Sequence, residues 1–328
     1  MKNPMVSSAN FFSSGVAAAM LDGEELNTNA LRTNKLLRND EWKQIDLAVV
    51  EAQRIRLNAV ADLYNRGLSL NIADGLGVMI LEWQTMTGKT GGRLDMSPQA
   101  QELNDRVKFA TKTLPLPVIH DDWQLGIRTL KAGRKKGTPI DTLQASESSK
   151  NVAEIIENLL INGSSSYEFD GSIIYGYTDY PDRNQVSLTT AWDDSAMTGA
   201  LIRDDVLAMK QASINAKYYG PFSLYVPTAY ETVLDEDYST NYGGKTIRQR
   251  ILDIAGIQSI TVNDTLSANN VLLVQMTSNV IRMVNGLPIQ NLQWDSKGGM
   301  LTNFKVMTIQ VPQIRSDSGT NCGVTHLS

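Results

Sequence analysis

The sequence predicts an α+β fold, because two strongly patterned stretches of opposite kind follow each other in the middle of the chain. From Leu114 to Ile127, apolar residues recur at alternate positions, as in strands with one face on a core. From Thr138 to Asn162, the apolar spacing is instead that of a helix. Few residue types used in catalysis occur in either stretch, so they indicate architecture rather than chemistry.

The limits of these two elements follow from local residue chemistry. Pro115 and Pro117 predict an edge strand, because proline donates no hydrogen bond to a ladder. A polar turn is expected at 134–137. Thr138 then caps the helix and Gly163 stops it. The helix, of roughly 24 residues, would be about 36 Å long. Its apolar face is formed by Val152, Ile155, Ile156, Leu159 and Leu160.

The stretches before residue 114 predict an arm, a helix and a long loop. Residues 1–33 have no sustained periodicity and are expected to be a mobile or draped arm. A helix is expected from Asn39 or Asp40 to about Gly67. In 68–113, the glycines and Pro98 rule out one continuous element, but the segments 79–83 and 107–109 can pair as strands.

The stretches after residue 163 alternate between expected helices and strands. Residues 235–245 are polar and contain glycine, which predicts an exposed loop. Helices are expected at 203–217, 230–234 and 247–254, and strands at 222–226, 271–275, 280–284 and 306–311.

Composition limits the function classes. The 328 residues suffice for one large or two medium domains, and 42% hydrophobic residues are ample for a core. A net charge of −5 does not fit a basic nucleic-acid clamp. Cys322 is the single cysteine, which excludes an intrachain disulfide and suits a reducing cytoplasm. No run approaches the roughly 20 apolar residues that span a bilayer, and 11–20 is a poor signal-peptide core, so we expect neither membrane insertion nor secretion.

Two Gly-Lys-Thr triplets, beginning at Gly88 and Gly244, resemble the end of a phosphate-binding loop. That motif needs another glycine five positions earlier, where Trp83 and Ser239 stand instead. We therefore expect flexible turns with solvated lysines.

The remaining candidate sites also have plainer interpretations. His120 stands beside Asp121 and Asp122, but the only other histidine is His326. A zinc site or a triad usually needs more partners, so we interpret His120 as a surface or interface histidine in a turn. The acidic run 235–237 offers too few ligands for calcium. The basic run 134–136 is interpreted as a solvated tip or a salt-bridge partner, with contact to nucleic acid as the alternative. No catalytic residue, cofactor or metal is predicted.

Three blocks, in this order, resemble the major capsid proteins of tailed bacteriophages with the HK97-type fold, and the related encapsulin shell proteins. The first is Asn39–Asp46, similar to the entry of the family's N-terminal helix. The second runs from the LPLP segment at 114–117 through Asp122-Trp123 and the turn 137–141 to the helix that ends at Asn162-Gly163. The third is Ile173–Tyr177. The resemblance covers roughly residues 35 to 312.

The resemblance implies a division into five parts. Residues 1–67 would be the N-terminal arm and helix, and 68–113 the extended loop that reaches across a neighbouring subunit. Residues 114–197 would be the peripheral domain, with its spine helix at 138–162. Residues 198–275 would be the axial domain, and 276–328 the return strands and C-terminal tail.

The resemblance also implies a structural function without enzymatic activity. The chain would form pentamers and hexamers of an icosahedral phage head around double-stranded DNA, bound without sequence specificity. It would be assembled in the host bacterial cytoplasm, with scaffold, cement and portal proteins as further partners. The expected intersubunit residues are Trp83, Lys89, Arg93, Arg106, Lys108, Arg134, Lys135, Asp237, Tyr238, Tyr242 and Lys245.

Two alternatives remain open at the level of the sequence. The first is an encapsulin-like compartment that holds a cargo enzyme instead of DNA. The second is a soluble α+β enzyme whose site has no recognisable motif, since catalysis by carboxylates needs neither histidine nor cysteine.

Overall fold

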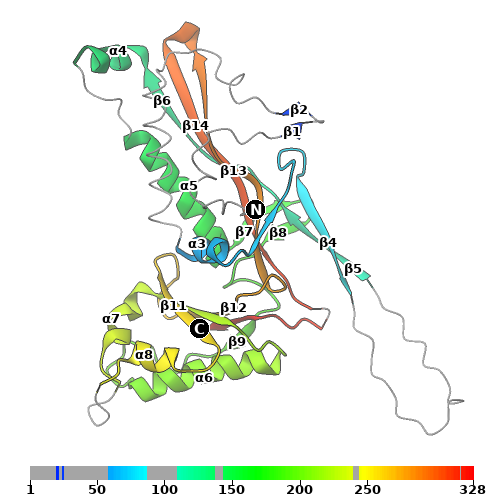
Figure 1. Cartoon of the computed structure of the whole chain (residues 1–328), viewed down its shortest axis with the longest axis vertical. Coiled ribbons are helices and arrows are strands. Elements are labelled where there is room, and N and C mark those ends of the chain that lie inside the picture. The colour runs from blue at the N-terminus through cyan, green and yellow to red at the C-terminus, as the bar shows by residue number, and fades with distance from the viewer. Residues whose placement is uncertain are drawn as a thin grey trace, which may run out of the picture. The chain divides into compact units, whose positions relative to one another are not determined.

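The computed structural model describes residues 20–21, 24–25, 58–86, 109–136, 143–238, 244–317 and 319–328. These residues form two compact units, each built from segments far apart in the sequence. The first unit draws on Met1–Met79, Leu116–Asn162 and Arg282–Gln313, and the second on Ile80–Pro115, Gly163–Ile281 and Ile314–Ser328. Helices and strands occur in both units, which confirms the predicted α+β class (Figure 1).

A four-stranded sheet organises the first unit, in the order β3-β13-β14-β6. β6 runs antiparallel to β14, and Trp123 lies opposite Phe304. The two rings stack with centroids 3.9 Å apart, which anchors the apolar side of this pairing. The strands are β3 (Ser69–Asn71), β6 (Ile119–Gly126), β13 (Ile281–Ser296) and β14 (Leu301–Ile314).

β13 and β14 are much longer than the strands expected at 280–284 and 306–311. Polar residues such as Asn291 and Gln293 break the apolar alternation, yet they continue the same ladder. A short helix, η3 (Lys297–Gly299), joins the two strands. The sequence pattern therefore identified one segment of each strand and missed the continuation, in which polar residues alternate irregularly with buried apolar ones such as Leu287 and Phe304.

The helix α5 (Leu143–Ile161) is the described part of the expected spine helix. Its 19 residues correspond to about 28 Å. In its first half the buried Ser149 hydroxyl donates to the Ala145 carbonyl at 2.9 Å, so this polar group has a partner inside the helix. α5 packs on β6 and on α3 (Asn58–Asn65), the described end of the expected N-terminal helix. Residues 137–142, including the predicted cap, lie outside the described part of the chain.

The predicted turn at 134–137 is wrong for residues 134–136. These residues end α4 (Ile127–Lys136), a helix that begins directly after β6. Ile127, expected in a strand, is its first residue. Leucine, alanine, lysine and arginine all favour a helix, and no proline interrupts the run, so helix propensity outweighed the reading of charge as a turn.

A five-stranded sheet organises the second unit, in the order β11-β10-β12-β15-β9. β10 is parallel to β11 and antiparallel to β12, and all six of its residues are buried. β15, near the C-terminus, pairs with β12 on one side and β9 on the other. The strands are β9 (Asn184–Val186), β10 (Phe222–Pro227), β11 (Ile257–Asn263), β12 (Val271–Gln275) and β15 (Val324–Leu327).

Helices pack against this sheet and close its core. The Thr198 hydroxyl caps α6 by accepting from the Leu201 N–H at 3.5 Å. Trp192 and Tyr230 stack in the same core with ring centroids 5.2 Å apart. The helices are α6 (Gly199–Asn215), η2 (Thr228–Tyr230), α7 (Glu231–Asp235) and α8 (Ile247–Leu252), close to the predicted positions.

Three further pairs of strands complete the described chain. β4 (Ile80–Met86) pairs antiparallel with β5 (Phe109–Pro115) to form a ribbon in the second unit. β7 (Ser164–Phe169) and β8 (Ser172–Ile174) form a hairpin in that unit, and the two-residue strands β1 (Met20–Leu21) and β2 (Glu24–Glu25) pair with each other.

The ribbon corrects two expectations. Pairing of the two flanks of 68–113 is confirmed, but the partner of β4 is 109–115 rather than 107–109. The LPLP segment is no single strand: Leu114 and Pro115 end β5, and the next strand begins at Ile119. Pro117 lies between two strands, where it interrupts no ladder.

The two units divide the chain at other positions than the predicted domain boundaries. Residues 163–197 and 314–328 were expected in the peripheral domain and its tail, and they lie in the second unit with the expected axial residues. The assignment of peripheral and axial domains stays a prediction.

Candidate functional site

The β4–β5 ribbon contains only part of the expected extended loop. Residues 68–79, also expected in that loop, lie in the first unit instead, where β3 pairs with β13. Glu82 and Gln84 on β4 and Thr111 on β5 are exposed, and Phe109 is 65% exposed. Each strand has the other as its only partner among the described strands, so one edge of each is unpaired. Exposed side chains and free edges make the ribbon a candidate surface for another chain.

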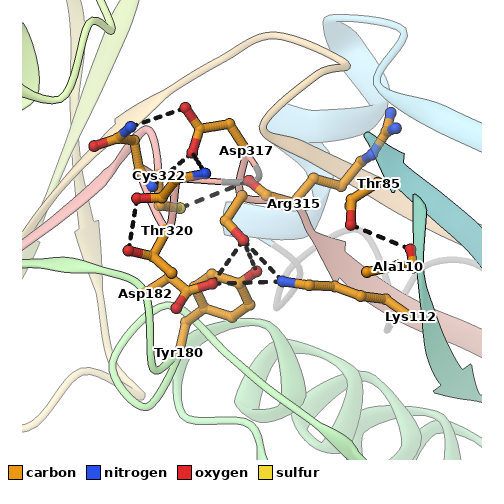
Figure 2. A network of polar contacts seen from close by, with 12 residues as sticks. Thr85, Ala110, Lys112, Tyr180, Asp182, Arg315, Asp317, Thr320 and Cys322 are labelled. Carbon is orange, nitrogen blue, oxygen red and sulfur yellow. Dashed lines mark hydrogen bonds and ion pairs between the residues drawn. The ribbon is translucent and has the colours of Figure 1, made fainter. Parts of the chain in front are cut away.

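A polar network holds the ribbon at its root (Figure 2). The Lys112 ammonium donates to the Ser316 hydroxyl at 2.9 Å and lies 3.4 Å from a carboxylate oxygen of Asp182. Ser316 donates to the same Asp182 oxygen at 2.6 Å, and the Tyr180 hydroxyl donates to Ser316 at 3.0 Å. Three distant segments of the second unit therefore meet at one serine.

Two neighbouring contacts strengthen this root. The hydroxyls of Thr113 and Ser172 share a hydrogen bond at 2.5 Å, which ties β5 to β8. The Thr85 hydroxyl donates to the Ala110 carbonyl at 3.2 Å across the ribbon, farther from the root.

A serine beside a lysine can form a nucleophile and its base, but the chemistry of this network favours an anchor. The Lys112 amine is ion-paired with Asp182, and an ammonium donates hydrogen bonds instead of accepting a proton. Burial raises the pKa of Tyr180, so its hydroxyl is neutral and donates. The arrangement binds β5 to the body of the second unit.

A second candidate surface lies where the predicted loop 235–245 leaves the unit. The Tyr238 N–H donates to the Lys245 carbonyl at 3.1 Å, and the Ile247 N–H donates to the Glu236 carbonyl at 3.0 Å. The Arg250 guanidinium lies 5.1 Å from the centre of the Tyr238 ring. These contacts hold residues 236–238 against residues 245–250, and we call this region the neck. Residues 239–243 lie outside the described part.

The predicted intersubunit residues occur at three separate places. Trp83 lies half-buried in the ribbon opposite Lys112, and its buried indole N–H has no partner among the described residues. Arg134 and Lys135 belong to α4, with Lys135 exposed. Exposed Asp237 and Lys245 and half-buried Tyr238 belong to the neck, where Lys245 forms an ion pair with Asp253. The positions outside the described residues are Lys89, Arg93, Arg106, Lys108 and Tyr242.

Both histidines fit structural positions. His120 is exposed on β6, rather than in a turn, with its Nδ1 3.3 Å from an Asp122 carboxylate oxygen. His326 is buried in β15, where it accepts from Arg183 Nε at Nδ1 and lies 2.8 Å from Asn270 at Nε2. Burial and the nearby Arg183 charge lower the pKa of His326 to about 4, which keeps the ring neutral.

The remaining sequence candidates for chemistry have structural explanations. Burial raises the pKa of the Cys322 thiol to about 12, which makes the thiol a poor nucleophile. The second Gly-Lys-Thr triplet supplies a helix cap, because the Thr246 hydroxyl accepts from the Gln249 N–H at 3.4 Å. Across the described ranges, no group of three or more acidic, histidine or cysteine side chains is placed to hold a metal ion. None of the helices within those ranges has the length and apolar character to cross a membrane.

No sequence pattern identifies the residues that complete the root of the ribbon. Tyr180 and Asp182 follow Lys112 by about 70 residues, and Ser316 follows it by 204. No local pattern connects positions so far apart, and each residue type is ordinary in a surface loop. Only the chain topology brings them together.

Solved structures with a similar fold include a virus-like particle and two capsids. A crystal structure of a virus-like particle from Pyrococcus furiosus superimposes with a TM-score of 0.64 and 16% identity, over 87% of this chain and 98% of that chain. The capsid of Myoviridae Phage XM1 gives 0.61 and 10%, over 76% and 85%. The capsid of a native GTA particle gives 0.57 and 13%, over 80% and 88%. No curated protein matches the chain by sequence.

These likenesses define the class of the protein: the chain has the HK97-type capsid fold, as its sequence predicted. Within that class it belongs to the family of unknown function DUF6260, whose pattern matches residues 29–326.

Proposed function

We propose that the chain is the major capsid protein of a tailed bacteriophage. It self-assembles into pentamers and hexamers of an icosahedral head that encloses double-stranded DNA, and it acts as a structural protein rather than an enzyme. The observation that carries this proposal is the similarity to shell proteins, which extends over most of this chain and of each matched chain.

The mechanism is interlocking of many modest interfaces. α5 stiffens the peripheral domain, the β4–β5 ribbon reaches a neighbouring subunit, and the neck around Tyr238 and Lys245 presents a loop toward the capsomer axis. Each contact is weak by itself, but a closed shell repeats it many times. Weak single interfaces also let misplaced subunits leave during assembly.

The ribbon supports this mechanism because, among the described residues, its contacts with the rest of the second unit gather at one end. The contacts of Lys112 and Thr113 hold the root, while Phe109 at the far end of the described part is 65% exposed. Burial of such an exposed aromatic side chain against another chain would contribute favourable free energy to an interface.

An encapsulin-like compartment for a protein cargo is the second candidate. The likeness to the virus-like particle from Pyrococcus furiosus, which covers 98% of that chain, favours it. The two candidates share the shell and differ in the contents. Localisation follows the same choice: a virion capsid assembled in the host cytoplasm, or a cellular compartment.

Electron microscopy of particles purified without nuclease tests both candidates. Angular shells with layered internal density support the phage head, and small uniform shells with discrete protein inside support the cargo compartment. Monomers or small oligomers under all assembly conditions would contradict both shell candidates. The leading alternative would then be the soluble α+β enzyme without a recognisable motif.

The role of the ribbon is tested by Phe109→Ser, compared with Phe169→Ser. Phe169 ends β7 and is 41% exposed, so the control removes the same ring from another two-stranded hairpin. We expect Phe109→Ser to fold normally and to lose shell formation, and Phe169→Ser to keep it. Normal shells from Phe109→Ser, counted by electron microscopy, would remove the ribbon from the mechanism.

A further inference from the structure

The helix α4 concentrates positive charge in a chain that is acidic overall. Its ten residues, IRTLKAGRKK, contain five cations and no acid, whereas the whole chain has a net charge of −5. Such a local excess is not needed for folding, because like charges one turn apart repel each other.

The exposed cations of α4 form one stripe. Arg128, Lys131 and Lys135 are exposed and spaced three and four residues apart, so they lie on the same face of the helix. The stripe extends for about 10 Å at 1.5 Å per residue. Lys297, exposed in η3, adds a cation nearby, because the Ile127 N–H donates to the Met300 carbonyl at 3.0 Å.

These four cations have no carboxylate partner in the described part of the first unit. Other cations of this unit do: Arg66 pairs with Asp62, Lys150 with Glu147, and Lys305 with Asp122. The charge of the stripe is therefore uncompensated by the parts of the unit that the structure describes, and a polyanion would gain favourable energy there.

The chemistry of the stripe suits phosphate groups. Lysine is depleted at the cores of protein interfaces, where aromatic anchors are usual, and the stripe itself carries none. Evenly spaced lysine and arginine on one face instead match the repeated charges of a nucleic-acid backbone, without reading bases. We propose that α4 and Lys297 form a surface that binds the phosphate backbone of DNA without sequence specificity. This inference rests on the proposed function for the source of the DNA.

Titration of the full chain with a fluorescein-labelled DNA duplex of mixed sequence tests the proposal. The variant is Lys131→Gln with Lys135→Gln. The control is Lys150→Gln with Lys217→Asn, which removes the same charge elsewhere; asparagine tolerates the left-handed backbone at Lys217, where φ is 69°. Fluorescence anisotropy across a salt series gives the affinity and its salt dependence.

We expect the α4 variant to reduce the slope of log affinity against log salt by roughly 1.8, since each phosphate contact contributes about 0.9. At about 0.1 M salt its affinity should fall by roughly tenfold or more. The control should keep the slope of the original chain. Equal slopes for the two variants would overturn the proposal.

Two further measurements distinguish DNA binding from binding of an acidic protein, and separate the α4 proposal from the proposed capsid function. If poly-glutamate binds through α4 and the DNA duplex does not, the surface docks an acidic protein and the proposal is wrong. Electron microscopy of the α4 variant tests assembly separately: normal shells with unchanged DNA content would refute the α4 assignment while leaving the proposed capsid function intact. If the original chain forms no shells, the capsid function fails, and the titration still decides whether α4 binds DNA.

Discussion

β10 and the β4–β5 ribbon are strands of the same unit with opposite environments. β10 has a partner on each side and buries all six of its residues. β4 and β5 have only each other among the described strands, and β5 is largely exposed until its last two residues. The central strand is stabilised within the chain, while the ribbon is fixed at the root through Lys112 and Ser316.

If the proposed function is correct, this difference separates folding from assembly. Substitutions in β10 should change the free energy of unfolding, because its side chains fill the core. Substitutions in the outer ribbon should leave that free energy nearly unchanged and act only when a second chain is present. The following predictions test this separation, beginning with the largest expected effect.

Leu224→Ala in β10 should destabilise the chain by about 2–5 kcal/mol, because Leu224 is fully buried and its removal leaves a cavity. Urea unfolding followed by circular dichroism measures the change. The matched variant Thr111→Ala, exposed in the ribbon, should change stability by less than about 0.5 kcal/mol. Comparable losses in both variants would contradict the comparison.

Acid should weaken the five-stranded sheet before the ribbon, through His326 in β15. Burial lowers its pKa to about 4, below the usual value of about 6.5, so the folded state binds the proton less readily than the unfolded state. The stability is therefore complete above about pH 6.5 and falls, by up to about 3 kcal/mol, as pH decreases toward 4. Unfolding curves across this range measure it, and His326→Gln should flatten the profile. An unchanged profile in that variant would show that other groups dominate.

Ser316→Ala should loosen the root of the ribbon. The hydroxyl contacts Lys112, Asp182 and Tyr180, and its loss leaves partly buried polar groups without a partner, at about 1–3 kcal/mol. Hydrogen exchange followed by mass spectrometry should quicken for β5 amides and stay slow for β10. Equal quickening in both strands would mean that the serine stabilises the whole unit.

Lys245→Ala should have the smallest effect on stability. Its ion pair with Asp253 is about half exposed on both sides, and exposed pairs contribute about 0–1 kcal/mol. Thermal unfolding measures this effect. If shell assembly fails while the melting temperature is unchanged, the neck acts in contacts between chains, as proposed for the outer ribbon. A large decrease in melting temperature would show that Lys245 stabilises the fold of the single chain instead.

The sequence predicted elements whose signals are local. β12 was expected at its observed limits, 271–275, because a short apolar run stands between turns. The described part of α5 was expected from its apolar spacing and from Gly163, whose φ of 69° suits glycine. In these cases local propensity and tertiary packing favour the same structure.

Elements defined by distant contacts were missed. β15 has only four residues and no turn signal that marks it as a strand. It is stabilised by backbone pairing with β12 on one side and β9 on the other. α4 was missed for a different, local reason. Its charged end, 134–136, was interpreted as a turn because charge suggested exposure, and exposure does not distinguish a helix from a loop. The network at the root of the ribbon combines residues from three distant segments, so no window of the sequence contains it.

The position of β15 has a consequence for synthesis of the protein. The strand between β12 and β9 is made of residues 324–327, so the five-stranded sheet stays incomplete until these residues leave the ribosome. In a nascent chain β12 keeps one edge unpaired until residues 324–327 are made, and the sheet can close only after that. A chain stalled or cleaved before residue 324 would therefore lack the strand that joins β12 to β9, and its sheet would stay open.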